Sequence, residues 1–153
     1  MASRMDPIMD LSLELRAKGA PHMLDRARVA AWLDAYVHAW KTCSPQAIGN
    51  LFSENATYFY DPFSEPLRGR VAIVASWLEQ PDTPGTYDGH YEPIIIEGDR
   101  AVANGRSRYF EQDSTTLKAE WNNLFLLRFD DAGRCTEFRE WYMKRPESQD
   151  GTQ

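Results

Sequence analysis

Residues 56–77 have the sequence ATYFYDPFSEPLRGRVAIVASW, which predicts a strand, a turn and a helix in succession. Aromatic residues crowd positions 58–60 and favour the strand. The pair Asp61-Pro62 ends it, because proline restricts the residue before it and cannot donate a hydrogen bond to a neighbouring strand. After Gly69, apolar residues recur at helical spacing: Ile73, Val74, Trp77 and Leu78. An acid at the end of an aromatic strand, beside a helix with a tryptophan, is typical of a small apolar pocket with one ionisable group.

The composition indicates one globular domain. A chain of 153 residues is long enough for a single core, and 42% hydrophobic with 26% charged residues is ordinary for a soluble protein. The net charge of −6 disfavours nucleic acid and anionic membranes as partners. No apolar run reaches the length of a membrane span and no secretory leader is visible, so we expect a cytoplasmic protein. Cys43 and Cys135 lack metal-ligand spacing and are expected to be reduced thiols, so neither a metal nor a cofactor is predicted.

Residues 1–23 differ from the rest of the chain. Leu11, Leu13 and Leu15 alternate with polar residues, which is compatible with a short docking motif, but the pattern favours a marginal helix or arm because such short motifs are weak signals. The run Gly-Ala-Pro-His-Met that ends at Met23 is also what abutting cloning sites could encode. We therefore treat residues 1–23 as an arm, 24–146 as the domain and 147–153 as a polar tail.

The remaining signals predict two helices before the aromatic strand and a sheet after the third helix. Asp25 can cap a helix that runs to about Lys41, and Ser44-Pro45 can begin a second helix. From Tyr87 onward the hydrophobic period becomes that of strands. We expect four of them, at residues 87–97, 100–112, 116–129 and 135–143. This order predicts an α+β domain.

The same order, with particular residues in it, resembles the nuclear transport factor 2-like superfamily and especially its SnoaL-like branch. The residues that carry the resemblance are Tyr36-Val37, Leu51-Phe52, Ala56-Thr57, Asp61-Pro62 with Ser64-Glu65-Pro66, Gly69, Arg128-Phe129 and Ala132-Gly133. The resemblance covers about Leu24 to Arg145. It implies a cone in which three N-terminal helices pack on a curved antiparallel sheet around a pocket, and a homodimer that forms through the outer sheet face. The superfamily contains isomerases, hydrolases, cyclases, ligand binders and adaptors, so the resemblance implies a fold more than a reaction.

Ketosteroid isomerase is the enzyme of this superfamily that the chain resembles best. Its general base is an aspartate before a proline, which Asp61 matches, and its oxyanion tyrosine is matched by Tyr36. The strand before Asp61 is one residue too long, so Asp61 points inward only if a bulge absorbs that residue. The second oxyanion donor falls on Phe125, which cannot donate a hydrogen bond, so steroid isomerisation is disfavoured. The Asp–Arg–Asp set of the epoxide-hydrolase relatives has no convincing counterpart.

Asp61 and Tyr36 are the candidate catalytic residues. An acid that faces an aromatic cavity has a raised pKa and can serve as general base or acid. The alternative for Asp61 is a turn cap that accepts N–H groups around Phe63. Tyr36 could donate to a substrate carbonyl, or could be a core tyrosine with its hydroxyl bonded internally.

The expected pocket wall is mostly aromatic. Asn123 is the polar residue on the inward face of its strand, where a ligand contact and a structural hydrogen bond are equally compatible with the pattern. Glu140 faces the cavity on one strand parity; on the other, Trp141 points inward and Glu140 is solvated. The other candidate contacts, for which plain core packing is the alternative, are Trp40, Tyr60, Phe63, Trp77, Trp121 and Phe125. Leu124 and Leu126 project from the opposite face, which fits a homodimer.

Three functions follow from these observations. The first is a domain that binds a small apolar, carbonyl-bearing molecule, with isomerase or cyclase chemistry that uses Asp61 and Tyr36. The second is a ligand-binding domain without chemistry. The third is a dimeric interaction module whose cone is filled by its own aromatic side chains.

Overall fold

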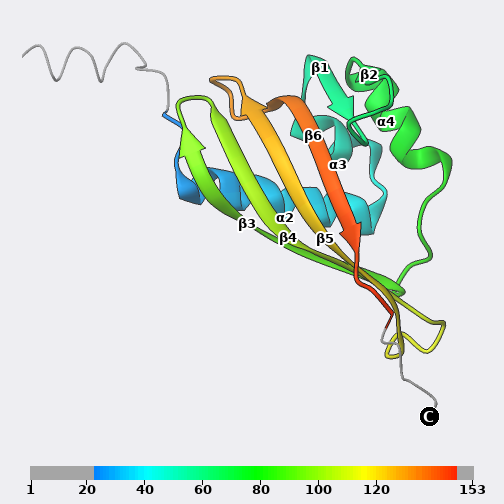
Figure 1. Cartoon of the computed structure of the whole chain (residues 1–153). Helices are drawn as coiled ribbons and strands as arrows, with labels where there is room; N and C mark the ends of the chain where they lie inside the picture. The colour runs from blue at the N-terminus through cyan, green and yellow to red at the C-terminus, as the bar shows by residue number, and fades with distance from the viewer. Residues whose placement is uncertain (1–22, 148–153) are drawn as a thin grey trace, which may run out of the picture.

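The computed structural model describes residues 23–147, which form three helices and a six-stranded sheet (Figure 1). The helices are α2 (Arg26–Thr42), α3 (Pro45–Leu51) and α4 (Arg70–Glu79). The strands are β1 (Phe52–Phe59), β2 (Leu67–Arg68), β3 (Tyr87–Glu97), β4 (Arg100–Phe110), β5 (Leu117–Phe129) and β6 (Cys135–Lys144). Apart from Met23, the predicted arm lies outside the described residues, and so do its leucines and the tail beyond Glu147.

Both expected helix starts are confirmed. The Asp25 carboxylate accepts a hydrogen bond from the Arg28 N–H at 2.8 Å, and the Ser44 hydroxyl accepts one from the Ala47 N–H at 3.2 Å. Each bond satisfies one of the N–H groups that have no partner within the first turn of a helix. No helix within the described part of the chain combines the length and the apolar character needed to cross a membrane.

The α+β class and the arrangement of three helices on a curved sheet are confirmed, with one difference in the sheet. Its strand order is β2-β1-β6-β5-β4-β3, and β1 pairs with β6 in parallel, whereas all other pairs are antiparallel. The segment through α4 carries the chain from β1 to the far edge of the sheet. Three hairpins then return β6 to the side of β1 in the same direction, so the sheet is mixed.

Strand β1 begins at Phe52, four residues before the predicted start, and its pairing with β6 is irregular between Phe52 and Thr57. Ala56, within the irregular stretch, and Tyr58, beyond it, are both buried. Strand β1 ends at Phe59, so Asp61 lies in the turn that follows the strand. The irregularity therefore does not turn Asp61 into the cone.

The core lies between the concave face of the sheet and the helices, with α2 crossing the sheet (Figure 1). Aromatic rings dominate it. Phe138 on β6 stacks against Tyr58, with ring centroids 4.3 Å apart, and against Tyr36, at 5.7 Å. These stacked rings fix the side chains that come from α2, β1 and β6, and they form the base on which the pocket is built.

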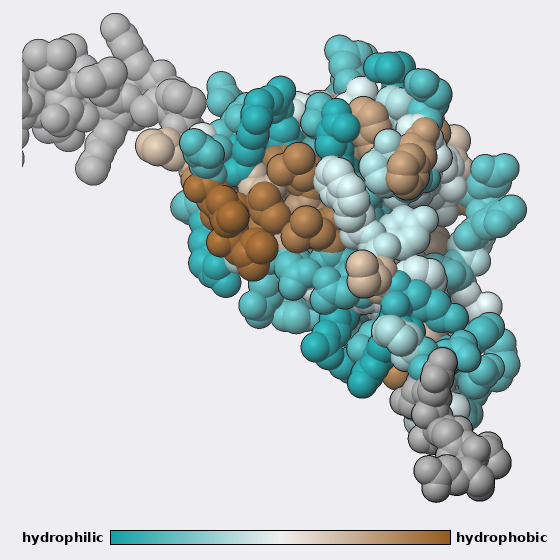
Figure 2. Space-filling view, viewed as in Figure 1, coloured by the Kyte–Doolittle hydropathy of each residue, from teal (hydrophilic) through white to brown (hydrophobic). Residues whose placement is uncertain are grey.

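The outer face of the sheet is only partly polar. Leu124 and Trp141, which pair across β5 and β6, are 39% and 41% exposed. Figure 2 shows apolar side chains gathered on one side of the molecule, and Ile94 and Ile95 at the end of β3 are also exposed. Apolar groups on this face are compatible with the expected homodimer, which stays a prediction.

Candidate small-molecule pocket

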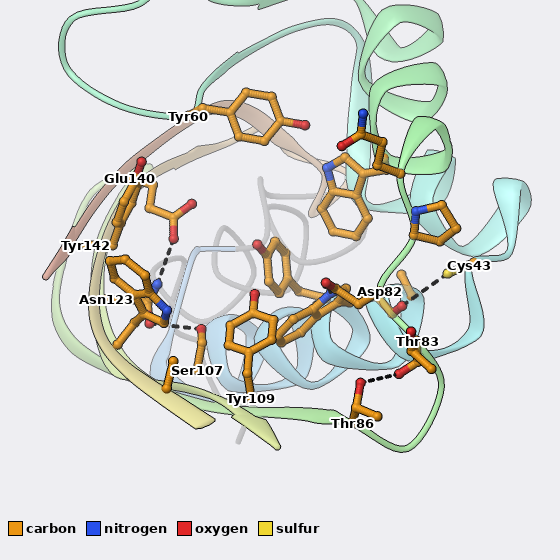
Figure 3. A pocket seen from close by; sticks show the side chains of 18 of the residues that line it. Cys43, Tyr60, Asp82, Thr83, Thr86, Ser107, Tyr109, Asn123, Glu140 and Tyr142 are labelled. Atoms are coloured by element: carbon orange, nitrogen blue, oxygen red, sulfur yellow. Dashed lines mark hydrogen bonds between the residues drawn. The ribbon is translucent and has the colours of Figure 1, made fainter. Parts of the chain in front are cut away.

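A cavity of about 740 Å³ opens between α2, α4 and the concave face of the sheet (Figure 3). The loop of residues 80–86 borders it on one side. Of the residues predicted from the sequence to meet a ligand, seven line this cavity: Tyr36, Trp40, Tyr60, Trp77, Trp121, Asn123 and Glu140. The cone of this protein is therefore not completely filled by its own side chains.

Two predicted contacts, Phe63 and Phe125, do not line the cavity. Phe63 is 95% exposed and lies in the turn that follows Pro62. Phe125 is 1% exposed and lies in the core, where its ring packs against Tyr91 at 4.6 Å and Phe138 at 4.9 Å. The predictions for these two side chains were wrong, since one belongs to the surface and the other to the layer beneath the pocket.

Asp61 caps its own turn. Its Oδ1 accepts the N–H groups of Phe63 at 2.7 Å and Ser64 at 2.9 Å, and its Oδ2 accepts the Ser64 hydroxyl at 2.7 Å. These hydrogen bonds, the Ser64 hydroxyl first, lower the pKa of the Asp61 carboxyl from its ordinary value. The expectation of a cavity-facing acid with a raised pKa was therefore wrong.

Glu140 is one of the acids that line the pocket. On β6, Phe138 and Glu140 point inward while Trp141 points outward, so the parity left open by the sequence is the one that directs Glu140 into the cone. Burial raises the pKa of Glu140 to about 7, and the hydrogen bond from Asn123 opposes this rise. A carboxyl of this kind changes its protonation state near neutral pH.

Three further side chains join Glu140 in a hydrogen-bonded chain that runs across the sheet, and Figure 3 shows the part from Ser107 through Asn123 to Glu140. Asn123 Nδ2 donates to Glu140 Oε1 at 2.7 Å, and Ser107 Oγ donates to Asn123 Oδ1 at 2.9 Å. The Tyr91 hydroxyl lies 2.6 Å from Ser107 Oγ. The chain takes one residue from each of β3, β4, β5 and β6, so its geometry depends on the register of the whole sheet.

Tyr36 lies against the inner wall of the pocket. Burial, followed by the neighbouring Tyr58 hydroxyl and the charge of Glu140, raises its pKa well above the ordinary tyrosine value. The hydroxyl is therefore neutral at pH 7 and available only as a hydrogen-bond donor or acceptor. Its ring is part of the stacked core, as the structural alternative expected, and the residue also lines the cavity, whereas its role toward a substrate stays a prediction.

Tyr60 and Tyr109 also line the cavity, and their hydroxyls differ in whether they form a hydrogen bond with another side chain. Tyr60 shares a hydrogen bond with Ser76 on α4, at 2.7 Å. Tyr109 makes no side-chain hydrogen bond with the residues that the structure describes, and Figure 3 shows its hydroxyl directed into the pocket. Burial raises the pKa of Tyr109 to about 12, so at neutral pH it can donate a proton to a ligand oxygen through a hydrogen bond.

Asp82, in the loop of residues 80–86, also lines the cavity and accepts a hydrogen bond from Trp40 Nε1 at 2.9 Å. This bond ties the 80–86 loop to α2. Sequence reasoning missed Asp82, because nothing local places a loop residue beside a distant helix. It also missed Ser107 and Tyr109, although both share the inward parity of Ala101 and Ala103 on β4, which could have identified them.

Among residues 23–147, no group of three or more His, Cys, Asp or Glu side chains lies close enough together to hold a metal ion.

The mixed sheet under three helices, with a pocket inside the cone, defines an α+β domain of the nuclear transport factor 2-like class. The SnoaL-like domain model matches residues 33–138, and the chain belongs to that family. No protein of curated function matches the chain.

Solved structures with the same fold include three that differ widely in sequence. An LEH-like epoxide hydrolase of M. tuberculosis is 12% identical, covering 77% of this chain and 84% of its own, with a TM-score of 0.57. An NTF2-like protein of unknown function from Burkholderia xenovorans is 14% identical over 81% and 89%, with a TM-score of 0.60. An NTF2-like protein with a cystatin-like fold from Novosphingobium aromaticivorans is 20% identical over 90% of each chain, with a TM-score of 0.59. At these identities the likeness concerns the fold alone.

Proposed function

We propose that the pocket binds a small, largely apolar molecule with a carbonyl group, and that Glu140 exchanges a proton with the carbon atom next to that carbonyl. The observation that carries this proposal is the position of the Glu140 carboxyl. It is a buried acid on the wall of an open cavity, and the sequence had given its role to Asp61. The acid–base role is therefore proposed for Glu140 in place of Asp61.

The hydrogen bonds of Glu140 leave one oxygen for a ligand. Oε1 accepts the amide of Asn123, and within the described residues no donor is bonded to Oε2. The same residues contain no fully buried side-chain oxygen or nitrogen without a partner, so Oε2 is open to the cavity. A general base must reach the proton that it removes, and Oε2 is the atom that satisfies this requirement.

The proposed step begins when Oε2 takes a proton from the carbon next to the carbonyl. The electrons of the broken C–H bond form a carbon–carbon double bond, and the carbonyl electrons move to its oxygen. The Tyr109 hydroxyl, or that of Tyr36, donates a hydrogen bond to the resulting enolate oxygen. Return of the proton to the same or another carbon completes an exchange or an isomerisation.

The walls favour a flat apolar body on the ligand. Trp40, Trp77 and Trp121 come from α2, α4 and β5 and present aromatic surface to the cavity. Epoxide hydrolysis is not proposed. In the epoxide hydrolases that the chain resembles, an arginine lies between two aspartates, and no arginine of the described residues lines the cavity.

The test combines binding with proton exchange. Cyclic enones, aromatic polyketide-like ketones and terpenoid ketones are first screened by thermal shift. Ketones that stabilise the protein are then incubated with it in D₂O, and loss of the signal of the proton next to the carbonyl is followed by NMR. Glu140→Gln should slow the exchange by about 10²- to 10⁴-fold while ligand affinity is largely kept.

Asp61→Asn is the matched control, since it neutralises the other carboxyl considered from the sequence. It should exchange at the wild-type rate. Loss of exchange in Asp61→Asn with retention in Glu140→Gln would overturn the proposal. Binding without exchange in the wild-type protein would favour the second candidate, a ligand-binding domain without chemistry, for which the aromatic walls alone provide the supporting observation.

A further inference from the structure

We propose that Ser107 and Tyr91 are positioning residues that hold the Asn123 amide in one orientation, so that Glu140 waits as a carboxylate ready to accept a proton. This inference deepens the proposed function and rests on it for the role of Glu140. Neither residue touches the reacting atoms in the proposed step. They act through Asn123: Ser107 is two hydrogen bonds away from Glu140 Oε1, and Tyr91 is three hydrogen bonds away.

The direction of each hydrogen bond follows from the number of protons available. Ser107 has one hydroxyl proton, and it is donated to Asn123 Oδ1 at 2.9 Å. The Tyr91 hydroxyl, 2.6 Å from Ser107 Oγ, must then be the donor in the remaining bond. Every proton in the chain from Tyr91 through Ser107 to Asn123 therefore points toward Glu140.

This polarity matters because an amide has two different ends. With Oδ1 held by the Ser107 hydroxyl, the NH₂ group faces Glu140 Oε1 at 2.7 Å and stabilises the negative charge. If the amide rotated by half a turn, its oxygen would meet the carboxylate oxygen, and only a protonated Glu140 could form a hydrogen bond there. Fixing the amide thus selects the ionised form, which is the form that a base requires.

The sheet contains a place made for the Tyr91 side chain. Gly105 on β4 lies opposite Tyr91 on β3, and a Cβ atom built on Gly105 would stand 2.6 Å from Cα and Cδ1 of Tyr91. A Cβ built on Gly89 would stand 2.9 Å from the Tyr91 hydroxyl. Two glycines therefore leave the space in which the ring lies over the sheet and directs its hydroxyl to Ser107.

Three charged residues, Asp82, Glu111 and Lys118, also line the cavity, but the pKa of Glu140 is shifted by its burial and by the Asn123 hydrogen bond and not by these charges. The other ionisable groups around Glu140 are neutral at pH 7. They are the hydroxyls of Tyr36 on α2, Tyr58 and Tyr60 on and after β1, Tyr91 on β3 and Tyr109 on β4. The charge of Glu140 contributes to raising the pKa of each of these tyrosines. No ionised group among them competes with the Asn123 amide in setting the protonation of Glu140, so the orientation of that amide has a direct effect.

The experiment measures the titration of Glu140 itself. Protein labelled with ¹³C at glutamate carboxyls is titrated by NMR, and the Glu140 signal is assigned by its loss in Glu140→Gln. Ser107→Ala should raise the midpoint by about 0.5 to 1 pH unit, because the amide loses the group that orients it. Tyr91→Phe, which removes a single hydroxyl, should raise it by a smaller amount. Ser107→Thr restores a hydroxyl and should return the midpoint to that of the wild type.

A merely structural role would not produce this pattern, since Tyr91→Phe keeps the ring and its packing and removes only the hydroxyl that is bonded to Ser107. A Ser107→Ala midpoint equal to that of the wild type would overturn the inference; if that variant does not fold, an unchanged midpoint in Tyr91→Phe does the same. The titration needs no substrate. If the Glu140 midpoints shift but no ketone exchanges its proton, the proposed reaction is refuted and the positioning role of Ser107 and Tyr91 is kept. If ketones exchange and the midpoints do not shift, only the positioning role is refuted.

Discussion

The wall of the pocket on β5 and β6 and the turn at residues 61–65 each contain an acid and a phenylalanine that the sequence marked as functional. On the wall, Glu140 faces the cavity and Phe125 lies in the core beneath it. In the turn, Asp61 binds its own backbone and Phe63 is exposed. The same two residue types therefore have different surroundings in the two regions, because strand parity and burial decide which groups each side chain contacts.

The two acids show the physical origin of this difference. Asp61 is exposed to solvent and accepts three hydrogen bonds, all of which favour its charged form. Glu140 is largely removed from water and accepts one, so the cost of burying the charge dominates. The pKa of Asp61 is lowered and that of Glu140 is raised for these reasons. A change in the number of donors or in burial should therefore move the acids in predictable directions.

The largest contrast is expected between the two phenylalanines. Phe125→Ala should lower the free energy of unfolding by about 3–5 kcal/mol, because it leaves a cavity among the rings of Tyr91 and Phe138. Phe63→Ala should change it by less than about 0.5 kcal/mol. Urea denaturation followed by tryptophan fluorescence measures both. Similar losses in the two variants would contradict the division between wall and turn.

The second contrast concerns the dependence of stability on pH. The pKa of Glu140 is about 7 in the folded protein against an ordinary value of 4.5, so the folded state binds more protons between these values. Stability of the wild type should therefore fall as pH rises through this window. Glu140→Gln removes the effect and should be more stable than wild type at pH 8, by up to about 3 kcal/mol, but not at pH 4.

Asp61→Ala should show the opposite sign. A lowered pKa contributes stability above the ordinary value of 3.8, and this contribution is lost as pH falls through the folded value. The variant should therefore melt below wild type at pH 7 and approach it in acid. Thermal melts of the three proteins from pH 3 to pH 8 separate the two acids. If the melting temperatures of Glu140→Gln and Asp61→Ala depend on pH in the same way, the two carboxyls do not differ in environment as described.

The fold could be predicted from local signals because those signals agree with one another. The caps at Asp25 and Ser44, the turn at Gly98-Asp99 and the alternation along β5 all indicated the elements that the structure contains. The parallel pairing of β1 with β6 could not be predicted in this way. It depends on where two strands far apart in the sequence meet, which no local pattern records.

The site was harder to predict because each position required a parity or a long-range contact. Asn123 was correctly placed on the inward face from the alternation along its own strand. The face of β6 on which Glu140 lies was left open by the sequence, since Trp141 and Tyr142 put aromatic residues on both faces of this strand. Asp61 was misplaced, because its neighbours in sequence are aromatic but its neighbours in space are the N–H groups of its turn. An aromatic neighbourhood in sequence is therefore a weak indicator of a buried acid.

The smallest expected effect is a preference of the pocket for the charge of its ligand. The cavity is lined by three acids, Asp82, Glu111 and Glu140, and by one base, Lys118. An anionic ligand should therefore bind more weakly than a neutral one of the same shape, by about tenfold for one unpaired carboxylate at an effective dielectric constant of about 20. Calorimetry with naphthyl methanol and naphthoate at pH 8 measures the ratio of their two dissociation constants.

Two variants test which acid the ligand meets. Because Glu140 belongs to the wall, Glu140→Gln should reduce the ratio of the dissociation constants, whereas Asp61→Asn should leave that ratio unchanged. If the ratio of dissociation constants changes in Asp61→Asn and not in Glu140→Gln, the ligand binds beside the turn at residues 61–65, and the assignment of the ligand site to the wall on β5 and β6 is wrong.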